Sequence, residues 1–160
     1  MISIAGTSCM STNTTLYEGD YYAWIQRQVE MLRMRHWAGL DTETLIQEIS
    51  SMGASERREL INRLAVLLAH LLKWQYQPSL QGRSWFLTLK EQRRQLARLL
   101  ADNPSLHARL SGFIVEAYGD AILMAARETG LNETIFPVEC PYSGEQIMDM
   151  EFCPGNATVN

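Results

Sequence analysis

Cysteine is scarce in this sequence of 160 residues, which contains only Cys9, Cys140 and Cys153. No two of them form a C-x-x-C pair, and three scattered thiols cannot build a disulfide scaffold or a zinc ribbon. We therefore expect free thiols and a protein of the reducing cytoplasm.

Long apolar runs and familiar catalytic motifs are also missing. The most apolar stretch covers residues 64–72, which is far shorter than the roughly 20 residues of a membrane-spanning helix. The sequence has no phosphate-binding loop, no G-x-S-x-G turn, and no His-x-x-x-His or Glu-x-x-His pair. We expect no membrane insertion, no cofactor and no metal site.

What the sequence does contain is typical of a soluble globular domain, with 46% hydrophobic and 20% charged residues. Its net charge of -4 is unevenly distributed. Residues 54–98 carry nine basic against three acidic side chains, whereas residues 99–160 carry two against nine. The basic middle either packs beside acidic helices or forms a face for an anionic partner such as nucleic acid.

Apolar residues recur at helical spacing along most of the chain, which predicts an all-α, single-domain bundle. Five main helices are expected, over residues 20–35, 41–53, 56–76, 84–101 and 104–129. Their boundaries are suggested by caps and breakers: Asp20, Gly53, Ser55, Ser84, the pair Asn103-Pro104, and Gly130. The third helix is apolar on nearly all sides, so it should lie in the middle of the bundle.

The ends of the chain differ in character from this bundle. Residues 1–15 are small and polar, and we expect a disordered leader there. The helical domain is expected over residues 16–153, followed by a tail at 154–160. Near its end, Ser143 and Gln146 fit a capping box, which predicts a short helix at about 144–149 within an otherwise irregular segment.

His70 is the first candidate for chemistry, because it lies inside the leucine-rich third helix. A buried imidazole needs a hydrogen-bond partner, and its pKa is easily moved. Lys73 follows it by one helical turn, and Glu48, or Glu116 and Glu128 on the fifth helix, could approach it in a bundle. The two interpretations are a core histidine with satisfied hydrogen bonds, or an acid/base or metal-binding centre formed by His70, Lys73, Glu48 and a carboxylate of the fifth helix.

Aromatic and cationic side chains are concentrated at the junction of the third and fourth helices, where Trp74, Tyr76, Arg83 and Trp85 occur. Such a mixture can anchor a protein partner or stack on bases. The simpler interpretation is a set of core aromatics covered by the stems of neighbouring cationic residues.

The fourth helix carries a basic face. Lys90, Arg94 and Arg98 recur every four residues, and Arg93 lies beside them. Either this face is solvated and paired with acidic neighbours, or together with Arg83 it contacts nucleic acid.

A series of short motifs, taken together, resembles the domain-of-unknown-function family 29, which comprises small bacterial proteins abundant in cyanobacteria. The motifs are Leu16-Tyr17-Glu18-x-Asp20-Tyr21-Tyr22-Ala23-Trp24, Glu48-Ile49-x-Ser51-x-Gly53, Glu56-Arg57-Arg58, His70-Leu71-Leu72-Lys73-Trp74-Gln75-Tyr76-Gln77-Pro78, Ser84-Trp85, Gln92-Arg93-Arg94, Asn103-Pro104-Ser105-Leu106, Glu128-Thr129-Gly130-Leu131 and Phe136-Pro137-x-x-Cys140-Pro141. The resemblance covers about residues 16–153. It implies an all-helical fold, and it implies no activity and no catalytic residues.

Three functional hypotheses follow. The first is a protein–protein interaction or self-associating module, anchored by Trp74, Tyr76 and Trp85. The second is a metal-binding or hydrolytic enzyme centred on His70. The third is a nucleic-acid-binding protein that uses the basic fourth helix.

Overall fold

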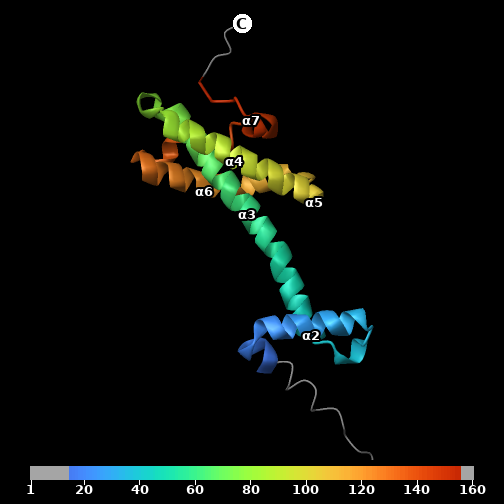
Figure 1. The fold of residues 1–160 in the computed structure, drawn as a ribbon. Coiled ribbons are helices and arrows are strands. Elements are labelled where there is room, and N and C mark those ends of the chain that lie inside the picture. The colour runs from blue at the N-terminus through green and yellow to red at the C-terminus, as the bar shows by residue number, and fades with distance from the viewer. Residues whose placement is uncertain (1–14, 156–160) are drawn as a thin grey trace, which may run out of the picture. The chain divides into compact units, whose positions relative to one another are not determined.

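The computed structural model describes residues 15–155. These residues form helices and connecting loops without any strand, so the prediction of an all-α fold is confirmed. The chain divides into two compact units, residues 1–53 and residues 54–160. Figure 1 shows the helices of each unit. The leader expected at residues 1–15 and the tail expected at 154–160 lie largely outside the described residues.

The first unit contains helix α2 (Tyr21–Arg33), the short 3-10 turn η1 (Trp37–Gly39) and the beginning of α3 (Thr42–Tyr76). The predicted cap at Asp20 is present, because its side chain accepts a hydrogen bond from the backbone N–H of Ala23 at 2.9 Å. Trp24 is 1% exposed. Among the described residues of this unit, it is the one buried hydrophobic side chain.

Asp41 connects α2 to the start of α3. Its Oδ2 accepts a hydrogen bond from Trp24 Nε1 at 3.3 Å, and its backbone N–H donates to Gln28 Oε1 at 2.9 Å. Its Oδ1 also accepts from the backbone N–H of Thr44 at 3.4 Å. One aspartate therefore holds two side chains of α2 against the first turn of the next helix.

Helix α3 runs without interruption for 35 residues, so the predicted break between two helices at residues 53–56 is wrong. Gly53 lies within the helix, and Ser55 does not cap a new one. A glycine inside a helix costs about 1 kcal/mol relative to alanine, which the helical residues on either side can offset. A glycine ends a helix when the chain takes a left-handed conformation there, as it does at Gly130, where φ is 73°.

The second unit is built around the C-terminal part of α3. The other long helices described in this unit are α4 (Arg83–Asp102) and α6 (Leu110–Thr129). The turn η2 (Pro78–Leu80) lies between α3 and α4, and α5 (Pro104–His107) lies between α4 and α6. After α6 come η3 (Glu133–Ile135) and α7 (Gly144–Met148). The predicted fourth helix is longer by one residue at each end, and Gly82 rather than Ser84 occupies its N-cap position.

The core of this unit forms around leucines of α3, as the sequence predicts. The α3 leucines with 0% exposure are Leu60, Leu64, Leu67, Leu68, Leu71 and Leu72. Their partners in the same cluster include Leu89 and Leu96 of α4 together with Ala117, Ala121 and Ala125 of α6.

The predicted fifth helix, residues 104–129, is interrupted. It begins at Pro104, as expected, but α5 ends at His107 and α6 starts at Leu110. Arg109 has φ -113° and ψ 11°, outside the helical range, so the chain changes direction there. A short helical turn, η3, follows α6, and Asn132 at its start accepts a hydrogen bond from the backbone N–H of Thr134 at 3.0 Å.

The predicted capping box at the start of α7 is confirmed. Ser143 Oγ accepts from the backbone N–H of Gln146 at 3.2 Å, and Gln146 Oε1 accepts from the backbone N–H of Ser143 at 2.9 Å. We expect Ser143→Ala to lower the free energy of unfolding by about 1 kcal/mol, because one helical N–H loses its partner. Chemical denaturation checks this, with Ser105→Ala as a control; equal losses in the two variants would contradict it.

Candidate functional site

Two of the candidate chemical residues are directly paired in the second unit. Lys73 lies in α3 with 5% exposure, and its Nζ donates a hydrogen bond to Glu128 Oε2 of α6 at 2.5 Å. The same ammonium lies 4.6 Å from the centroid of the Trp85 ring. Lys73 is therefore held between a carboxylate and an aromatic face, which compensates a cation removed from water.

His70 lies one turn before Lys73 and is half-buried. Its Nδ1 is 2.9 Å from the carbonyl oxygen of Val66, so its hydrogen bond is made within α3. Burial lowers the pKa of His70, and the Lys73 ammonium lowers it further. The Glu128 carboxylate opposes this shift without reversing it. At neutral pH the imidazole is thus held in its uncharged form.

Glu48 occupies the first unit and has different partners. Its Oε1 accepts a hydrogen bond from Tyr17 Oη at 2.5 Å, and its Oε2 accepts from Tyr21 Oη at 2.8 Å. These two hydrogen bonds lower the pKa of Glu48. Glu48 was expected on a separate helix that folds back beside His70. Instead, Glu48 belongs to the first unit and His70 to the second.

Within the second unit, the described residues bring His70, Lys73 and Glu128 together. The lysine and the glutamate neutralise each other, and the imidazole is bonded to its own helix. Among residues 15–155, no group of three or more His, Cys, Asp or Glu side chains is arranged to hold a metal ion. The pair's geometry stabilises the contact between α3 and α6.

The predicted aromatic anchors participate in the packing of the second unit. Trp74 and Phe86 have ring centroids 6.4 Å apart, and Tyr76 meets Phe136 edge-on at 5.2 Å. Trp74 and Trp85 are each only partly accessible. Trp74 Nε1 is buried and has no hydrogen-bond partner among the described residues. These rings offer an outside partner only part of their surface.

Arg93 does not belong to the basic outer face of α4, because its exposure is 0%. Its Nε donates to the carbonyl of Ile147 at 2.8 Å, and its Nη2 donates to the carbonyl of Phe152 at 2.8 Å. A longer hydrogen bond of 3.4 Å joins Nη2 to the carbonyl of Gln146. The expectation that Arg93 contacts nucleic acid is wrong: its guanidinium holds the C-terminal segment against α4.

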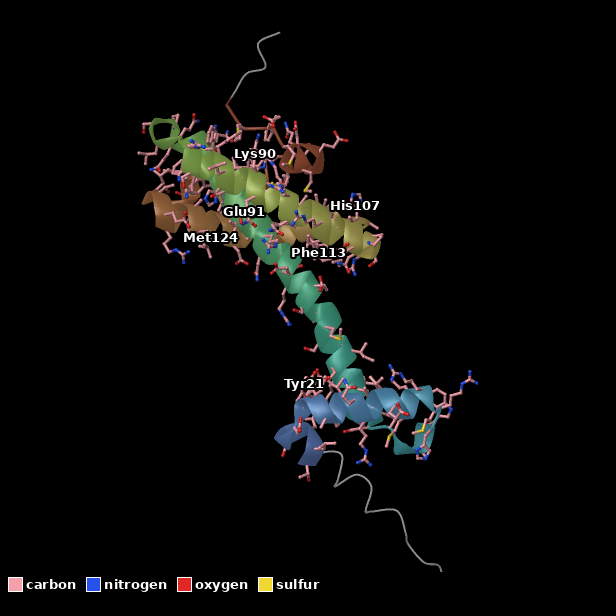
Figure 2. The ribbon with its side chains drawn as sticks, viewed as in Figure 1. Tyr21, Lys90, Glu91, His107, Phe113 and Met124 are labelled. Carbon is pink, nitrogen blue, oxygen red and sulfur yellow. The ribbon has the colours of Figure 1, made fainter. Side chains whose placement is uncertain are left out.

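The C-terminal segment also reduces the charge of the remaining basic face. Lys90 Nζ forms an ion pair with Glu151 at 3.0 Å. Arg94 and Arg98 are exposed, and Glu91, labelled in Figure 2, lies with them in a shallow depression of α4. Arg83 is exposed at the start of the same helix. Two arginines beside an acidic residue make a weak site for a phosphate backbone.

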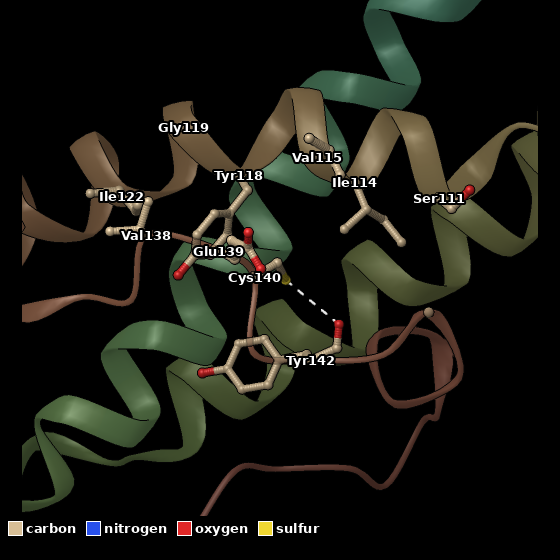
Figure 3. A pocket seen from close by; sticks show the side chains of 11 residues that line it. Ser111, Ile114, Val115, Tyr118, Gly119, Ile122, Val138, Glu139, Cys140 and Tyr142 are labelled. Atoms are coloured by element: carbon tan, nitrogen blue, oxygen red, sulfur yellow. Dashed lines mark hydrogen bonds between the residues drawn. The ribbon is translucent and has the colours of Figure 1, made fainter.

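An apolar groove of about 660 Å³ lies between α6 and residues 138–144, and the sequence analysis did not anticipate it (Figure 3). The hydroxyl of Tyr118 on its wall donates to the carbonyl of Pro137 at 2.9 Å. Burial raises the pKa of Tyr118 to about 12. Burial also raises the pKa of the half-buried Cys140, whose Sγ lies 3.6 Å from the carbonyl of Tyr142. The groove is therefore an apolar cavity in which the Cys140 thiol is not activated as a nucleophile.

Exposed apolar side chains are frequent in residues 21–52. Eight large hydrophobic residues there are more than 40% exposed: Tyr21, Tyr22, Leu32, Met34, Trp37, Ile46, Ile49 and Met52. Three of them, Ile46, Ile49 and Met52, lie along α3 at intervals of three residues. Residues 49–53, at the end of the first unit, are all exposed. Sequence periodicity did not reveal this, because the same apolar spacing is typical of a buried face.

Comparison with known proteins decides the family. A profile for the domain of unknown function DUF29 matches residues 16–153. The chain belongs to the DUF29 family. No curated protein and no solved structure matches this DUF29 chain. In its described part, no helix has both the length and the apolar character needed to cross a membrane.

Proposed function

We propose that this DUF29 protein is a protein–protein interaction module whose binding surface is the exposed apolar stripe of α3. The stripe consists of Ile46, Ile49 and Met52, which are 55%, 66% and 68% exposed. The single observation that carries the proposal is the high exposure of these three apolar side chains, which no other described residue of the first unit buries. Isolated helices are marginal in water, because most helical stability in proteins comes from packing of an apolar face.

The small core of the first unit supports the same proposal. A unit of about 50 residues is marginal even when its core is well packed. Here Trp24 is the one buried hydrophobic side chain in the described residues up to position 53. A partner that covers the α3 stripe would add the apolar burial that the unit lacks, at roughly 25 cal/mol per Å².

This proposal moves the binding surface away from Trp74, Tyr76 and Trp85. Those side chains already pack against Phe86, Phe136 and Lys73. Covering these side chains further would remove less apolar surface from water than covering Ile49 or Met52 would. A binding role for Trp74, Tyr76 and Trp85 at the junction of α3 and α4 stays a prediction, and the crosslinking experiment tests it from a neighbouring position.

Site-specific photo-crosslinking in cells tests the proposed surface. The photoreactive residue p-benzoylphenylalanine is placed at position 49 or 52 on the stripe, at exposed position 47 on another side of α3, or at exposed position 83 beside the aromatic junction. We expect protein adducts from positions 49 and 52, because a partner helix would lie within reach of both. Position 47 should give few adducts.

Two results would contradict the proposal. One is the absence of adducts at positions 49 and 52 in chains that are folded by circular dichroism. The other is an adduct pattern dominated by position 83, which would return the binding surface to Arg83, Trp74 and Trp85.

A further inference from the structure

We propose that the turn between α2 and α3 docks on a surface of anionic lipid. This turn, residues 31–40, is called the tip below (Figure 1). The inference goes beyond the proposed function, because it uses another surface of the first unit and another kind of partner. Docking of this kind takes place at the lipid–water boundary and needs no membrane-spanning helix.

The tip presents large apolar side chains to solvent. Leu32, Met34 and Trp37 are 44%, 62% and 64% exposed. Every residue from 32 to 38 is exposed, so no described residue of the first unit buries this run. Trp37 is the one exposed tryptophan of the chain, since the other three are buried or half-buried. Tryptophan is enriched where membrane proteins meet the headgroup layer, because its ring is apolar while its N–H is polar.

The charge of the tip is positive. Arg33, Arg35 and His36 lie between the apolar residues, and residues 31–40 contain no Asp or Glu. Arg33 reaches Glu30 at 3.9 Å, but both side chains are more than half exposed, so this ion pair is weak. Anionic lipids attract arginines near the surface, and the arginine stems lie in the apolar layer while the guanidinium groups stay among the headgroups. The two kinds of side chain therefore match the two layers of such a surface.

The backbone places an arginine where glycine is usual. Arg35 has φ 55°, and among residues 15–155 it is the one residue other than glycine with a positive φ. The backbone N–H of His36 donates to the carbonyl of Met31 at 2.9 Å, and that of Arg35 donates to the carbonyl of Leu32 at 3.1 Å. These two hydrogen bonds form a Schellman motif, whose left-handed position is usually glycine. A role of the Arg35 side chain in binding explains why this strained position holds an arginine.

Gly39 lets the tip close on itself. A Cβ built at Gly39 would lie 2.9 Å from both His36 Nδ1 and Met31 Sδ. Side chains from both sides of the turn therefore contact the backbone at Gly39, which is buried. A turn that is already formed loses little conformational entropy when it docks, so more of the contact energy appears as affinity.

A lipid surface fits the tip better than a nucleic acid does. Arginine and tryptophan can contact phosphates and stack on bases. Leu32 and Met34 have no ring that would stack, but both gain free energy by leaving water for the boundary between headgroups and acyl chains. Nucleic acid is therefore an outcome that the experiment must detect.

Vesicle co-sedimentation of the full chain tests the proposal. We expect binding to vesicles of phosphatidylcholine and phosphatidylglycerol in equal parts, and about tenfold weaker binding to phosphatidylcholine alone. Trp37→Ala should lower the partition coefficient on the anionic vesicles by about tenfold. Tyr22→Ala removes another exposed aromatic side chain more than two turns before the tip, and it should change the coefficient by less than about twofold.

Arg35→Gly separates binding from stability. Glycine adopts the left-handed conformation without strain, so we expect the melting temperature of the variant to equal or exceed that of wild type. The partition coefficient should nevertheless fall about fivefold, because one cation near the lipid surface is lost. Arg94→Gln removes an exposed arginine of the second unit, and it should change the coefficient by less than about twofold.

Three results would overturn the proposal. The first is no sedimentation of wild type with anionic vesicles at millimolar lipid. The second is equal binding of wild type, Trp37→Ala and Arg35→Gly. The third is Arg35-dependent binding to single-stranded RNA without vesicle binding, which would assign the tip to nucleic acid. Vesicle binding does not depend on the α3 stripe, so Ile49→Ser should bind as wild type does whether or not the proposed function holds.

Discussion

Arg93→Met is expected to lower the free energy of unfolding by about 2–4 kcal/mol, one of the two largest effects in this chain. The substitution keeps an apolar stem in the same space, but it leaves the carbonyls of Ile147 and Phe152 without their donor. Buried carbonyls that lose a partner cost about 1–3 kcal/mol each, and part of this loss is offset because a buried charge is removed.

The effect should be concentrated in the C-terminal segment. Hydrogen–deuterium exchange is expected to show faster exchange in residues 144–155 of the Arg93→Met protein, while α3 stays protected. Two of the carbonyls bound by Arg93 belong to the last turn of α7, and a cation is favourable at that end of a helix. Without the guanidinium, both the helix end and the loop after it lose their attachment to α4.

Two variants serve as controls for this experiment. Arg94→Met removes an exposed arginine from the next position, and it should change stability by less than about 0.5 kcal/mol. Arg93→Lys should recover only part of the loss, because one ammonium cannot reach carbonyls on two sides as a planar guanidinium does. Equal stability of Arg93→Met and Arg94→Met would show that the buried hydrogen bonds contribute nothing.

Glu128→Gln should give the second large effect, a loss of about 1–3 kcal/mol. It leaves Lys73, with 6% of its side chain exposed, without its counter-charge. Breaking a fully buried pair costs about 3–5 kcal/mol, and the smaller value applies here because 38% of the Glu128 side chain is exposed and solvent screens it. Thermal and chemical unfolding at pH 7 measure the loss.

The matched control lies on the same helix. Glu116 of α6 pairs with Arg57 at 2.6 Å, and the two side chains are 45% and 47% exposed. We expect Glu116→Gln to cost less than about 1 kcal/mol, as is usual for an exposed ion pair. If the two variants lose equal stability, the burial of Lys73 does not govern the strength of its ion pair.

The pH dependence of stability gives an independent test of the same pair. The hydrogen bond from Lys73 lowers the pKa of Glu128 below its ordinary value of 4.5. The stabilisation by ionised Glu128 is therefore complete above pH 4.5 and is lost as the pH falls through the folded-state pKa. Glu128→Gln should remove this acid-dependent loss.

A second titration, that of His70, begins at higher pH. Its folded-state pKa is lowered from 6.5, so stability starts to fall below that pH in both proteins. The loss of stability caused by His70 should be nearly the same in wild type and in Glu128→Gln, because the Glu128 carboxylate makes only the smallest contribution to the pKa of His70. The difference between the two curves then isolates Glu128.

Local signals in the sequence predicted several helix ends correctly. Asp20, Gly130 and the pair Ser143 and Gln146 each act through hydrogen bonds or backbone conformation within a few residues. The leucine periodicity of residues 60–72 also predicted the buried helix of the second unit. These features depend on neighbours in the chain, so a single sequence is enough to recognise them.

Gly53 and Ser55 show where local signals fail. Both residues are typical of a helix boundary, yet α3 continues through them. A helix ends when capping and tertiary packing together favour another backbone conformation, and the exposed residues Gly53 and Ser55 are not buried by packing that would favour one. The propensities of two residues are too small to break a 35-residue helix.

The sequence by itself determined the helical fold, the leucine core around α3 and the capped helix ends. Only the tertiary structure decided that Arg93 is buried while Ile49 and Met52 are exposed. The physical reason is the separation along the chain of the residues that interact. Helix formation and capping depend on residues a few positions apart. The environment of Arg93 depends on a segment more than 50 residues later in the chain, and that of Ile49 on the absence of a covering segment among the described residues of the first unit.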